Sequence, residues 1–508
     1  MYLRKVRNRF GNVSIQVVKK VSGKRTIVSH LGTAKNDLEK FELLKRGRDY
    51  IDRDRIKSGV ISLFDNRFES NELTEITNKL IFGPVYDTPS FLFFEYYYNL
   101  LGLKNLKDDL FKDLCLARIL HPASKMETRD YLEEKFGKVY SLTQIYRGML
   151  KAYDKNYREK IEKILFDFSR KYISKEVSIL FFDVTTLYYE SFKQDAFRKN
   201  GFSKDNKSNQ PQIVISLVVT ETGFPLKFKV FEGNKFEGHT MIPVIKELIK
   251  TQNLNDCVVV ADAAMLSGEN IKNLENENIK FIVGARLGNL NRNLFDKITS
   301  DAFMLKTDGQ TKRIMHKNNL SLIISYSTKR AQKDKSDREK QIKKAITALK
   351  NPANVTRNYK FLAKDKLTLN LNQSLIQKQE KLDGLKGYVT NANYLTNAEV
   401  IKKYSELWQV EKSFRISKSD LKARPIFHTT KQKILTHILI VFTSLAITRY
   451  AELKNLKSVK KMISVLSQVK EIKITDRVTG NSTHSYTNPQ KPQILNQLLQ
   501  DTNLNWGT

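Results

Sequence analysis

The chain has 508 residues, a formal net charge of +34 at pH 7 and a pI near 9.8. This length is sufficient for several domains, each with its own buried core. So large a positive charge is unusual for an enzyme of small metabolites, and it favours a polyanion such as DNA or RNA contacted over a long surface. Part of the charge has an alternative explanation, namely compositional drift in a proteome rich in lysine and asparagine.

The cysteines, the histidines and the apolar segments exclude several other classes of protein. Cys115 and Cys257 are far apart in apolar surroundings, which argues against a disulfide framework, and the 7 histidines are too scattered for a zinc site. The first residues lack the apolar segment of a signal peptide. Residues 434–450 are strongly apolar but short and carry His, Thr and Ser, so we expect a buried core helix in a soluble intracellular protein.

Residues 1–84 are predicted to form a β-hairpin followed by a helical region. The alternating runs VSIQVVKK (13–20) and RTIVSHLG (25–32) are typical of two short strands, and a charged helical stretch follows them over residues 35–55. The next run, SGVISLFDN (58–66), has only a weak pattern.

Residues 85–174 have a helical pattern without good strands. Ser124 and Ser141 precede two of the expected helices and are suitable N-caps. Basic residues recur among these helices, namely Lys125, Arg129, Arg147 and Lys151. They are consistent with a helical module that binds DNA ends, and equally with a helical scaffold that has a solvated basic face.

Residues 175–286 are predicted to form the first part of an α/β core. The run KEVSILFFDVTTLYYES (175–191) is continuously apolar and β-branched, as in a buried central strand, and two further strands are expected at 211–222 and 225–233. Helices and strands then alternate through HTMIPVIKELIKT, DCVVVADAAML, SGENIKNLENE and KFIVGAR. Three antiparallel strands followed by this alternation are the element order of a ribonuclease-H-like core.

Residues 287–396 interrupt the alternation. Strand-like runs flank a strongly basic helix at 329–350, and a further short strand is expected at 384–391. We interpret this region as a separate β-rich insertion, whose basic helix either faces DNA or is an ordinary solvated helix.

The remaining residues would complete a multidomain α+β protein. Residues 397–453 are predicted to return to the core with a polar helix and the apolar helix described above. Residues 454–508 are predicted to be a basic C-terminal tail, in which NSTHSYTNPQKPQ (481–493) has the composition of a loop.

The stretch Tyr404–Lys422 contains neither Pro nor Gly and has helical periodicity. Tyr404, Glu411 and Lys418 are spaced seven residues apart, so on one continuous helix they would form a single stripe. Arg415 and Lys422, each four residues after a member of the stripe, would widen it. A carboxylate between a phenol and cations suits a metal-assisted phosphodiester site, whereas the alternative is a solvated face with a Glu411–Arg415 ion pair.

Two further carboxylates favour the metal site. Asp183 lies inside the apolar strand 175–191, and Asp262 ends the next buried strand. A carboxylate in an apolar strand is costly unless it is paired or bound to metal. If both converge with Glu411, two divalent cations about 3.5–4 Å apart would remove the repulsion and serve an in-line displacement at phosphorus. Oxygen ligands favour two Mg²⁺ ions, with Mn²⁺ as the alternative. Singly, a strand-end cap at Asp183 and a helix N-cap at Asp262 are ordinary explanations.

Together these motifs resemble the DDE transposases of bacterial insertion sequences, in particular the branch whose glutamate helix carries a tyrosine–arginine–glutamate–lysine signature. The resemblance covers residues 105–450 and rests on the runs FFDVTTLYYES, GFSKDNKSNQPQIVISL, VVVADAAMLS and LWQVEKSFRISKSDLKARPIFH. It implies a catalytic, metal-binding triad made of Asp183, Asp262 and Glu411. It also implies that Tyr404 and Lys418 contact phosphates of the transposon end, and that 287–396 is the insertion that this branch places before its glutamate.

One position departs from the signature. By spacing, its arginine falls on Leu407, and Arg415 or Lys412 would have to supply the missing cation. Trp408, one turn from Tyr404 and Glu411, is a candidate for stacking on an unpaired base, although packing in the core is the favoured interpretation.

The sequence therefore predicts a DNA transposase that cuts double-stranded DNA at the terminal inverted repeats of its element and joins the new 3′ ends to target DNA. Chemistry on two ends implies a homodimer on DNA, associated with the nucleoid in the cytoplasm. The alternatives are a ribonuclease-H-fold nuclease without strand transfer and a catalytically inactive DNA-binding relative.

Overall fold

The computed structural model of the chain describes residues 1–8, 12–21, 23–57, 80–174, 178–190, 192–201, 209–254, 257–265, 267–315, 319–350, 359–364, 369–477, 480–487, 492–499 and 502. The run SGVISLFDN lies outside them. The chain divides into two compact units, which are described separately: Met1–Phe82 with Ile474–Ser482, and Gly83–Lys473 with Thr483–Thr508.

The first unit contains an antiparallel sheet in the order β1-β2-β3 and a helix. Its elements are β1 (Tyr2–Arg7), β2 (Val13–Val21), β3 (Lys24–Ala34) and α1 (Asp37–Lys57). The expected hairpin and charged helix are confirmed as β2, β3 and α1. Strand β1 is additional; most of its side chains are exposed, so it has no alternating apolar pattern.

The second unit begins with a helical module, as predicted. Its elements are α3 (Thr88–Leu100), η1 (Leu103–Leu106), α4 (Asp109–Leu120), α5 (Lys125–Phe136), α6 (Leu142–Asp154) and α7 (Tyr157–Tyr172). The Ser124 hydroxyl accepts a hydrogen bond from the Glu127 N–H, and the Ser141 hydroxyl accepts one from the Gln144 N–H. Both N-cap predictions are confirmed.

A mixed sheet follows, whose strands run in the spatial order β10-β11-β14-β9-β8-β5-β6-β7 among the described residues. The expected core strands are β5 (Ile179–Tyr188), β6 (Gln212–Val219), β7 (Pro225–Glu232), β8 (Val258–Ala261) and β9 (Lys280–Ala285). β5, β6 and β7 are antiparallel neighbours, whereas β5–β8 and β8–β9 are parallel. The expected crossover helices are present as α8 (Met241–Gln252) and α9 (Gly268–Asn276), and short turns of helix are η2 (Glu237–His239), η3 (Ala263–Met265) and η4 (Leu287–Asn289).

The interpretation of residues 287–396 as a separate subdomain is wrong in one respect. The strands β10 (Thr311–Met315), β11 (Ser321–Tyr326) and β14 (Leu385–Thr390) continue the core sheet, because β14 pairs with β9 at its hydrogen-bonding edge. The short pair β12 (Leu362–Lys364) and β13 (Leu369–Leu371) lies outside that sheet. The helices of the region are α10 (Arg292–Ile298), the basic α11 (Thr328–Leu349) and α12 (Gln373–Glu380).

The prediction of one continuous helix over Tyr404–Lys422 is also wrong. The stretch contains the end of α13 (Asn397–Ser405), a turn at Glu406 and Leu407, α14 (Trp408–Arg415) and the π-helical η6 (Ile416–Asp420). In the turn the Leu407 N–H bonds to the Tyr404 carbonyl, an i to i+3 contact that tightens the backbone. The predicted stripe of Tyr404, Glu411 and Lys418 is therefore not carried by a single helix, since these residues lie on α13, α14 and η6, respectively.

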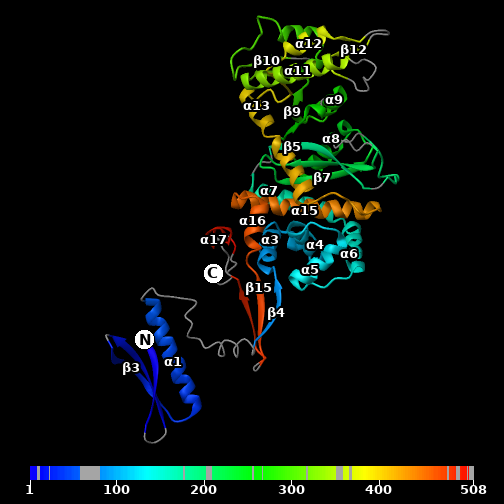
Figure 1. Ribbon diagram of the computed structural model, residues 1–508. Coiled ribbons are helices and arrows are strands. Elements are labelled where there is room, and N and C mark those ends of the chain that lie inside the picture. Colours follow the sequence, from blue (N-terminus) through cyan, green and yellow to red (C-terminus); the bar gives the residue numbers. More distant parts are fainter. Residues whose placement is uncertain are drawn as a thin grey trace. The chain divides into compact units, whose positions relative to one another are not determined.

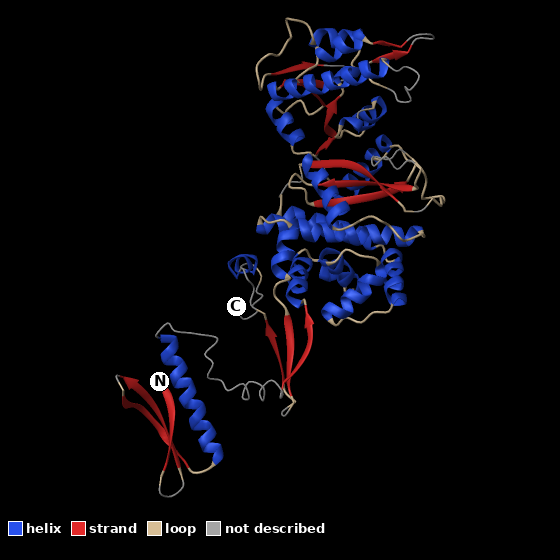
Figure 2. Ribbon diagram, viewed as in Figure 1, coloured by secondary structure: helices blue, strands red, loops and turns tan. Residues whose placement is uncertain are grey.

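The apolar helix is α15 (Lys431–Asn455), and it is a core element as expected. It is long and apolar enough to cross a membrane by length and composition, but 94% of its apolar window is buried inside the protein. α15 packs on α3, α4 and α6 of the helical module and on β7 of the sheet, so it forms the layer between them (Figure 1, Figure 2).

The C-terminal segment is more ordered than the predicted tail. It contains α16 (Val459–Leu466), β15 (Glu471–Asp476), β16 (Ser482–Tyr486) and α17 (Pro492–Leu499). Strand β15 lies between β16 and β4 (Leu80–Tyr86) in a three-stranded sheet. Ser482–Tyr486 falls within the stretch NSTHSYTNPQKPQ, which the sequence predicts to be a loop, and that prediction is wrong for these residues. Its side chains are mostly exposed, and hence the segment has a loop-like composition although its backbone pairs in a sheet.

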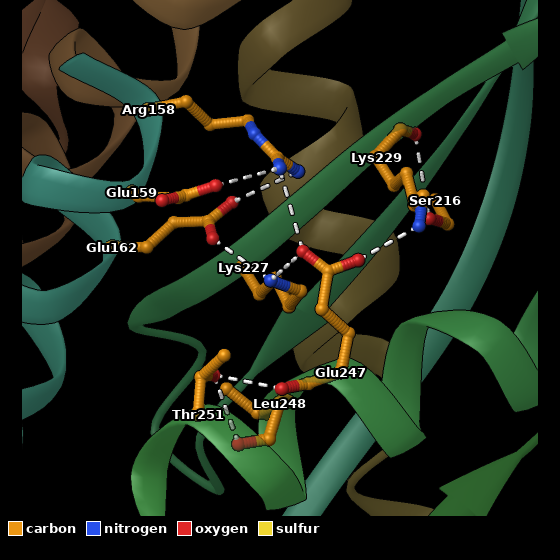
Figure 3. Close-up of polar contacts among 9 residues, drawn as sticks. All are labelled: Arg158, Glu159, Glu162, Ser216, Lys227, Lys229, Glu247, Leu248 and Thr251. Atoms are coloured by element: carbon orange, nitrogen blue, oxygen red, sulfur yellow. Dashed lines mark hydrogen bonds and ion pairs between the residues drawn. The ribbon is translucent and has the colours of Figure 1, made fainter. Parts of the chain in front are cut away.

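A buried ion network ties α7, β7 and α8 together. The Lys227 ammonium on β7 lies 2.8 Å from both a Glu162 oxygen on α7 and a Glu247 oxygen on α8 (Figure 3). Lys229 and Arg158 add further contacts to Glu247. Burial by itself would raise the pKa of Glu247, but hydrogen bonds from Lys227 and Lys229 outweigh it and lower that pKa to about 2.

Replacing Lys227 by Met is expected to lower the free energy of unfolding by about 3 kcal/mol, because it leaves two carboxylates without their shared cation in the interior. Urea denaturation followed by circular dichroism measures this. Lys229→Met removes the same charge from a side chain that is 32% exposed, and it should cost about 1 kcal/mol or less. An equal loss in both variants would contradict the assigned role of Lys227.

Candidate active site

Asp183 and Asp262 occupy equivalent positions on neighbouring parallel strands. The register of β5 and β8 places Phe182 opposite Ala261, so the next residues along the two strands are Asp183 and Asp262. Aligned residues of parallel strands point to the same face of the sheet, and the strands are about 4.8 Å apart. The two carboxylates are therefore neighbours on one face, where β8 ends and β5 continues.

Each of these carboxylates is also oriented by its own backbone. An Asp183 oxygen accepts the Val184 N–H at 2.7 Å, and an Asp262 oxygen accepts the Ala263 N–H at 2.6 Å. Asp183 is half-buried and Asp262 is exposed. Neither carboxylate is fully enclosed in the core.

Helix α14 brings Glu411 to the same sheet. Val410 and Phe414 are buried where α14 packs on β5 and β6, and the Ser413 hydroxyl donates to the Gly223 carbonyl at 3.1 Å. Glu411 lies outside this buried face and is exposed. The amphipathic pattern of α14 thus fixes which side of the helix presents the carboxylate.

Tyr404 connects Glu411 with Asp262. Its side chain is only 9% exposed, and its hydroxyl hydrogen-bonds to the Asp262 carboxylate. Burial and the negative charges of Asp262 and Glu411 raise the pKa of Tyr404, so the phenol remains a proton donor. The hydroxyl reaches Asp262 by passing over Gly284 of β9, where a Cβ atom would lie 2.4 Å from the phenol oxygen.

Lys386 of β14 is a site residue that the sequence motifs did not indicate. Its ammonium lies 4.7 Å from the centroid of the Tyr404 ring, within electrostatic range of Asp262 and Glu411. Burial and the neighbouring Arg330 lower the pKa of Lys386. The only sequence signal was a lysine in a run of strand-forming residues, and its position beside the carboxylates depends on β14 pairing with β9.

The structure separates the other predicted residues into two groups. Lys418 lies in η6 near Thr185 and Phe414, in the wall of a cavity of about 30 Å³, and Lys422 is exposed. Trp408 and Arg415 line a different cavity of about 860 Å³.

Two of the expectations for α14 are corrected by its surroundings. Trp408 is 50% exposed, so its favoured placement in the core is wrong. Lys412 pairs with Glu452 at 3.1 Å, so its charge already has a partner, and Leu407, the residue in the signature slot, is buried. Arg415 is exposed and is the remaining candidate for the missing cation.

The donor set suits a hard divalent cation. Asp183, Asp262 and Glu411 offer only carboxylate oxygens, which Mg²⁺ and Mn²⁺ prefer. Within the part of the chain that the structure describes, no three acidic, His or Cys side chains already converge on one metal position. Two of the carboxylates are adjacent in register, and Glu411 and Asp262 both interact electrostatically with Tyr404 and Lys386.

The contact of Tyr404 with Gly284 gives a prediction about stability. Gly284→Ala should cost about 1–3 kcal/mol, because the new methyl group overlaps the phenol oxygen. In a Tyr404→Phe background the same change should cost less, since the overlapping atom is gone. Thermal unfolding measures both. Gly268→Ala is the matched control, with no heavy atom within 4 Å of its Cβ position, and should be nearly neutral. Additive costs at Gly284 and Tyr404 would contradict this packing.

Comparison with known proteins identifies the family. The family model described as the transposase DDE domain matches residues 175–447, which span β5, β8, α14 and most of α15. No curated protein matches the chain in sequence. Among solved structures, the chain is similar to a cryo-EM structure of the piggyBac transposase synaptic complex with hairpin DNA, with 12% identity, 74% of this chain and 70% of that chain covered, and a TM-score of 0.40. Because the family model covers more than half of the 508 residues, the chain belongs to the transposase DDE-domain family.

Proposed function

We propose that this transposase cuts double-stranded DNA at the terminal inverted repeats of a bacterial insertion sequence and joins the resulting 3′ ends to target DNA. The observation that supports this most directly is the placement of Asp183 and Asp262 side by side on β5 and β8, with Glu411 carried onto the same sheet by α14. The strand order β7-β6-β5-β8-β9, antiparallel on one side of β5 and parallel on the other, supports a ribonuclease-H-like core.

Asp183, Asp262 and Glu411 would hold two Mg²⁺ ions, with Mn²⁺ as the alternative. When bound, such ions activate the attacking hydroxyl and neutralise charge on the leaving oxygen. Tyr404 keeps Asp262 oriented through its hydrogen bond, and Lys386 offers a positive charge at the edge of the carboxylates. No covalent bond between protein and DNA is required, because the carboxylates act only as ligands.

The DNA would be held by cations around this site and by the general positive charge of +34. Lys418, Lys422 and Arg415 follow Glu411 in the chain and are proposed to contact backbone phosphates. The proposed role of Tyr404 is modified by its burial, since its hydroxyl is already bonded to Asp262. Trp408, half-exposed in a large cavity beside Arg415, is suited to stacking on an unpaired base.

Two chains are proposed to act together, since each DNA end needs its own set of carboxylates, and the protein would work on the nucleoid in the cytoplasm. The second candidate function is a nuclease of the same fold that cuts without joining. It is favoured only if hydrolysis proceeds and strand transfer does not.

The first test is a cleavage assay on a duplex that carries the element's end, with Mg²⁺ or with EDTA. The wild type should nick the end only with Mg²⁺ and then join it to plasmid DNA, whereas Asp183→Asn should do neither. Nicking without joining would favour the nuclease, and binding without cutting in any metal would favour an inactive relative.

A second test separates metal binding from DNA binding. Glu411→Gln should abolish cleavage while the affinity for the end, measured in EDTA, stays near that of the wild type. Glu269→Gln, at an exposed position on α9, is the matched control and should remain active. Equal losses of binding and cleavage in Glu411→Gln would refute its role as a metal ligand.

A third test addresses the phosphate contacts. Lys418→Ala should weaken binding of the end and reduce the slope of log K against log salt by about one. Lys402→Ala removes the same charge from an exposed position on α13 and should leave the slope unchanged. An unchanged slope in Lys418→Ala would remove this residue from the DNA interface.

A further inference from the structure

A cluster of buried basic side chains lies between the helical module and α15, away from the carboxylates. It consists of Arg118, Lys125, His428 and His437, which we call the buried cation cluster. Their exposed fractions are 5%, 5%, 8% and 4%, respectively. The two imidazole rings are 5.4 Å apart, and both histidines interact electrostatically with Arg118 and Lys125.

The cluster has no negative charge of its own. Among the described residues, neither Arg118 nor Lys125 has a hydrogen-bond or ion-pair partner, and no carboxylate acts on either of them. Burial is the main cause that lowers the pKa of Arg118 to about 10, so this guanidinium is still charged at neutral pH. Burial and the neighbouring Arg118 lower the pKa of Lys125 well below its usual value. Burial also lowers the pKa of His428 to about 4, so the histidines are neutral and add no further positive charge.

The other buried cations of the chain are treated differently. Within the described residues, the buried lysine and arginine side chains besides these two are Arg198, Lys227, Arg338 and Arg449. Each of them pairs with a carboxylate: Arg198 with Asp195, Lys227 with Glu162 and Glu247, Arg338 with Asp383, and Arg449 with Glu452. Arg118 and Lys125 are thus the exceptions, and they are neighbours.

The position of the cluster connects it to the proposed active site. Arg118 lies in the last turn of α4, and Lys125 is the first residue of α5, beneath α15 (Figure 1). His428 belongs to the loop that follows Glu411 and η6, and His437 on α15 bonds to the Ala423 carbonyl of that loop at 3.2 Å. The same loop places Arg424 over the ring of Tyr188 on β5, 4.7 Å from its centroid.

We propose that the buried cation cluster is a binding site for one phosphate-like oxyanion, supplied either by the backbone of bound DNA or by free inorganic phosphate. A single oxyanion would neutralise Arg118, favour the protonated form of Lys125 and accept hydrogen bonds from both side chains. The half-buried Lys433, over the ring of Tyr146, and Tyr146, against His428, extend the basic surface outward from the cluster. The DNA source rests on the proposed function; the free-phosphate source does not.

The first experiment compares Lys125→Met with Lys227→Met in thermal unfolding of the full chain, with and without inorganic phosphate. Both changes replace a buried lysine by an apolar side chain of similar length. Without phosphate, Lys125→Met should raise the unfolding temperature, since it removes a buried amine that has no carboxylate partner, whereas Lys227→Met should lower it because it leaves buried carboxylates without their cation. Phosphate should raise the unfolding temperature of the wild type and of Lys227→Met in a saturable manner, and this shift should be lost in Lys125→Met. Arg118→Met provides a second variant with the same expectation.

The second experiment identifies the source of the oxyanion by measuring binding of an end duplex in EDTA. If DNA supplies it, Lys125→Met weakens binding several-fold and phosphate competes with DNA for the wild type only. If free phosphate supplies it, the phosphate-dependent thermal shift remains specific to Lys125 while DNA binding is unchanged.

The proposal is overturned if Lys125→Met retains the full phosphate shift and the wild-type affinity for DNA. It is also overturned if both buried-lysine variants lose stability equally without phosphate. A wild type that binds no DNA would count against the proposed function, while the phosphate experiment would still decide the inference.

Discussion

The parallel pairing of β5 with β8 is the contact on which the proposed active site depends. It aligns Phe182 with Ala261 and thereby sets Asp183 beside Asp262. A shift of one residue in this register would turn one carboxylate to the opposite face of the sheet. The register is held by continuous apolar strands that are buried on both faces, because moving either strand would expose apolar side chains to water. The burial of apolar side chains in the core therefore fixes the positions of the Asp183 and Asp262 carboxylates.

The same sheet explains why the insertion matters for the site. Because β14 adds to the edge of β9, Gly387 pairs with Ala285 and Tyr388 pairs with Gly284. This brings Lys386 and Tyr388 beside Tyr404, and it leaves the space over Gly284 through which the phenol reaches Asp262. Strand β14, which follows Asp183 and Asp262 in the chain, therefore contributes side chains beside these carboxylates, as α14 does.

The buried lysine and arginine side chains of this strongly basic chain fall into two groups, those with a carboxylate partner and those without one. Where a buried cation serves the fold, a carboxylate accompanies it, as for Lys227 with Glu162 and Glu247, or Arg449 with Glu452. Arg118 and Lys125, which we propose to face a bound oxyanion, have no carboxylate partner among the described residues. Desolvating an ion costs several kcal/mol unless it is paired. Binding of an external anion should therefore lower the free energy most where buried cations lack a carboxylate partner.

The sequence by itself determined the local elements and the chemical groups. The apolar runs of β5, β8 and α15, the N-caps Ser124 and Ser141, and the three carboxylates could all be recognised from period and composition, because these depend on neighbours in the chain. The tertiary structure alone decided that β14 joins β9, that the stretch after Tyr404 breaks into α13, α14 and η6, and that Ser482–Tyr486 pairs as a strand. It also decided which buried cations find partners. These features depend on contacts between residues far apart in sequence. The spacing of apolar residues does not give the register in which two strands pair, and the sequence does not distinguish a paired lysine from a solvated or a buried one.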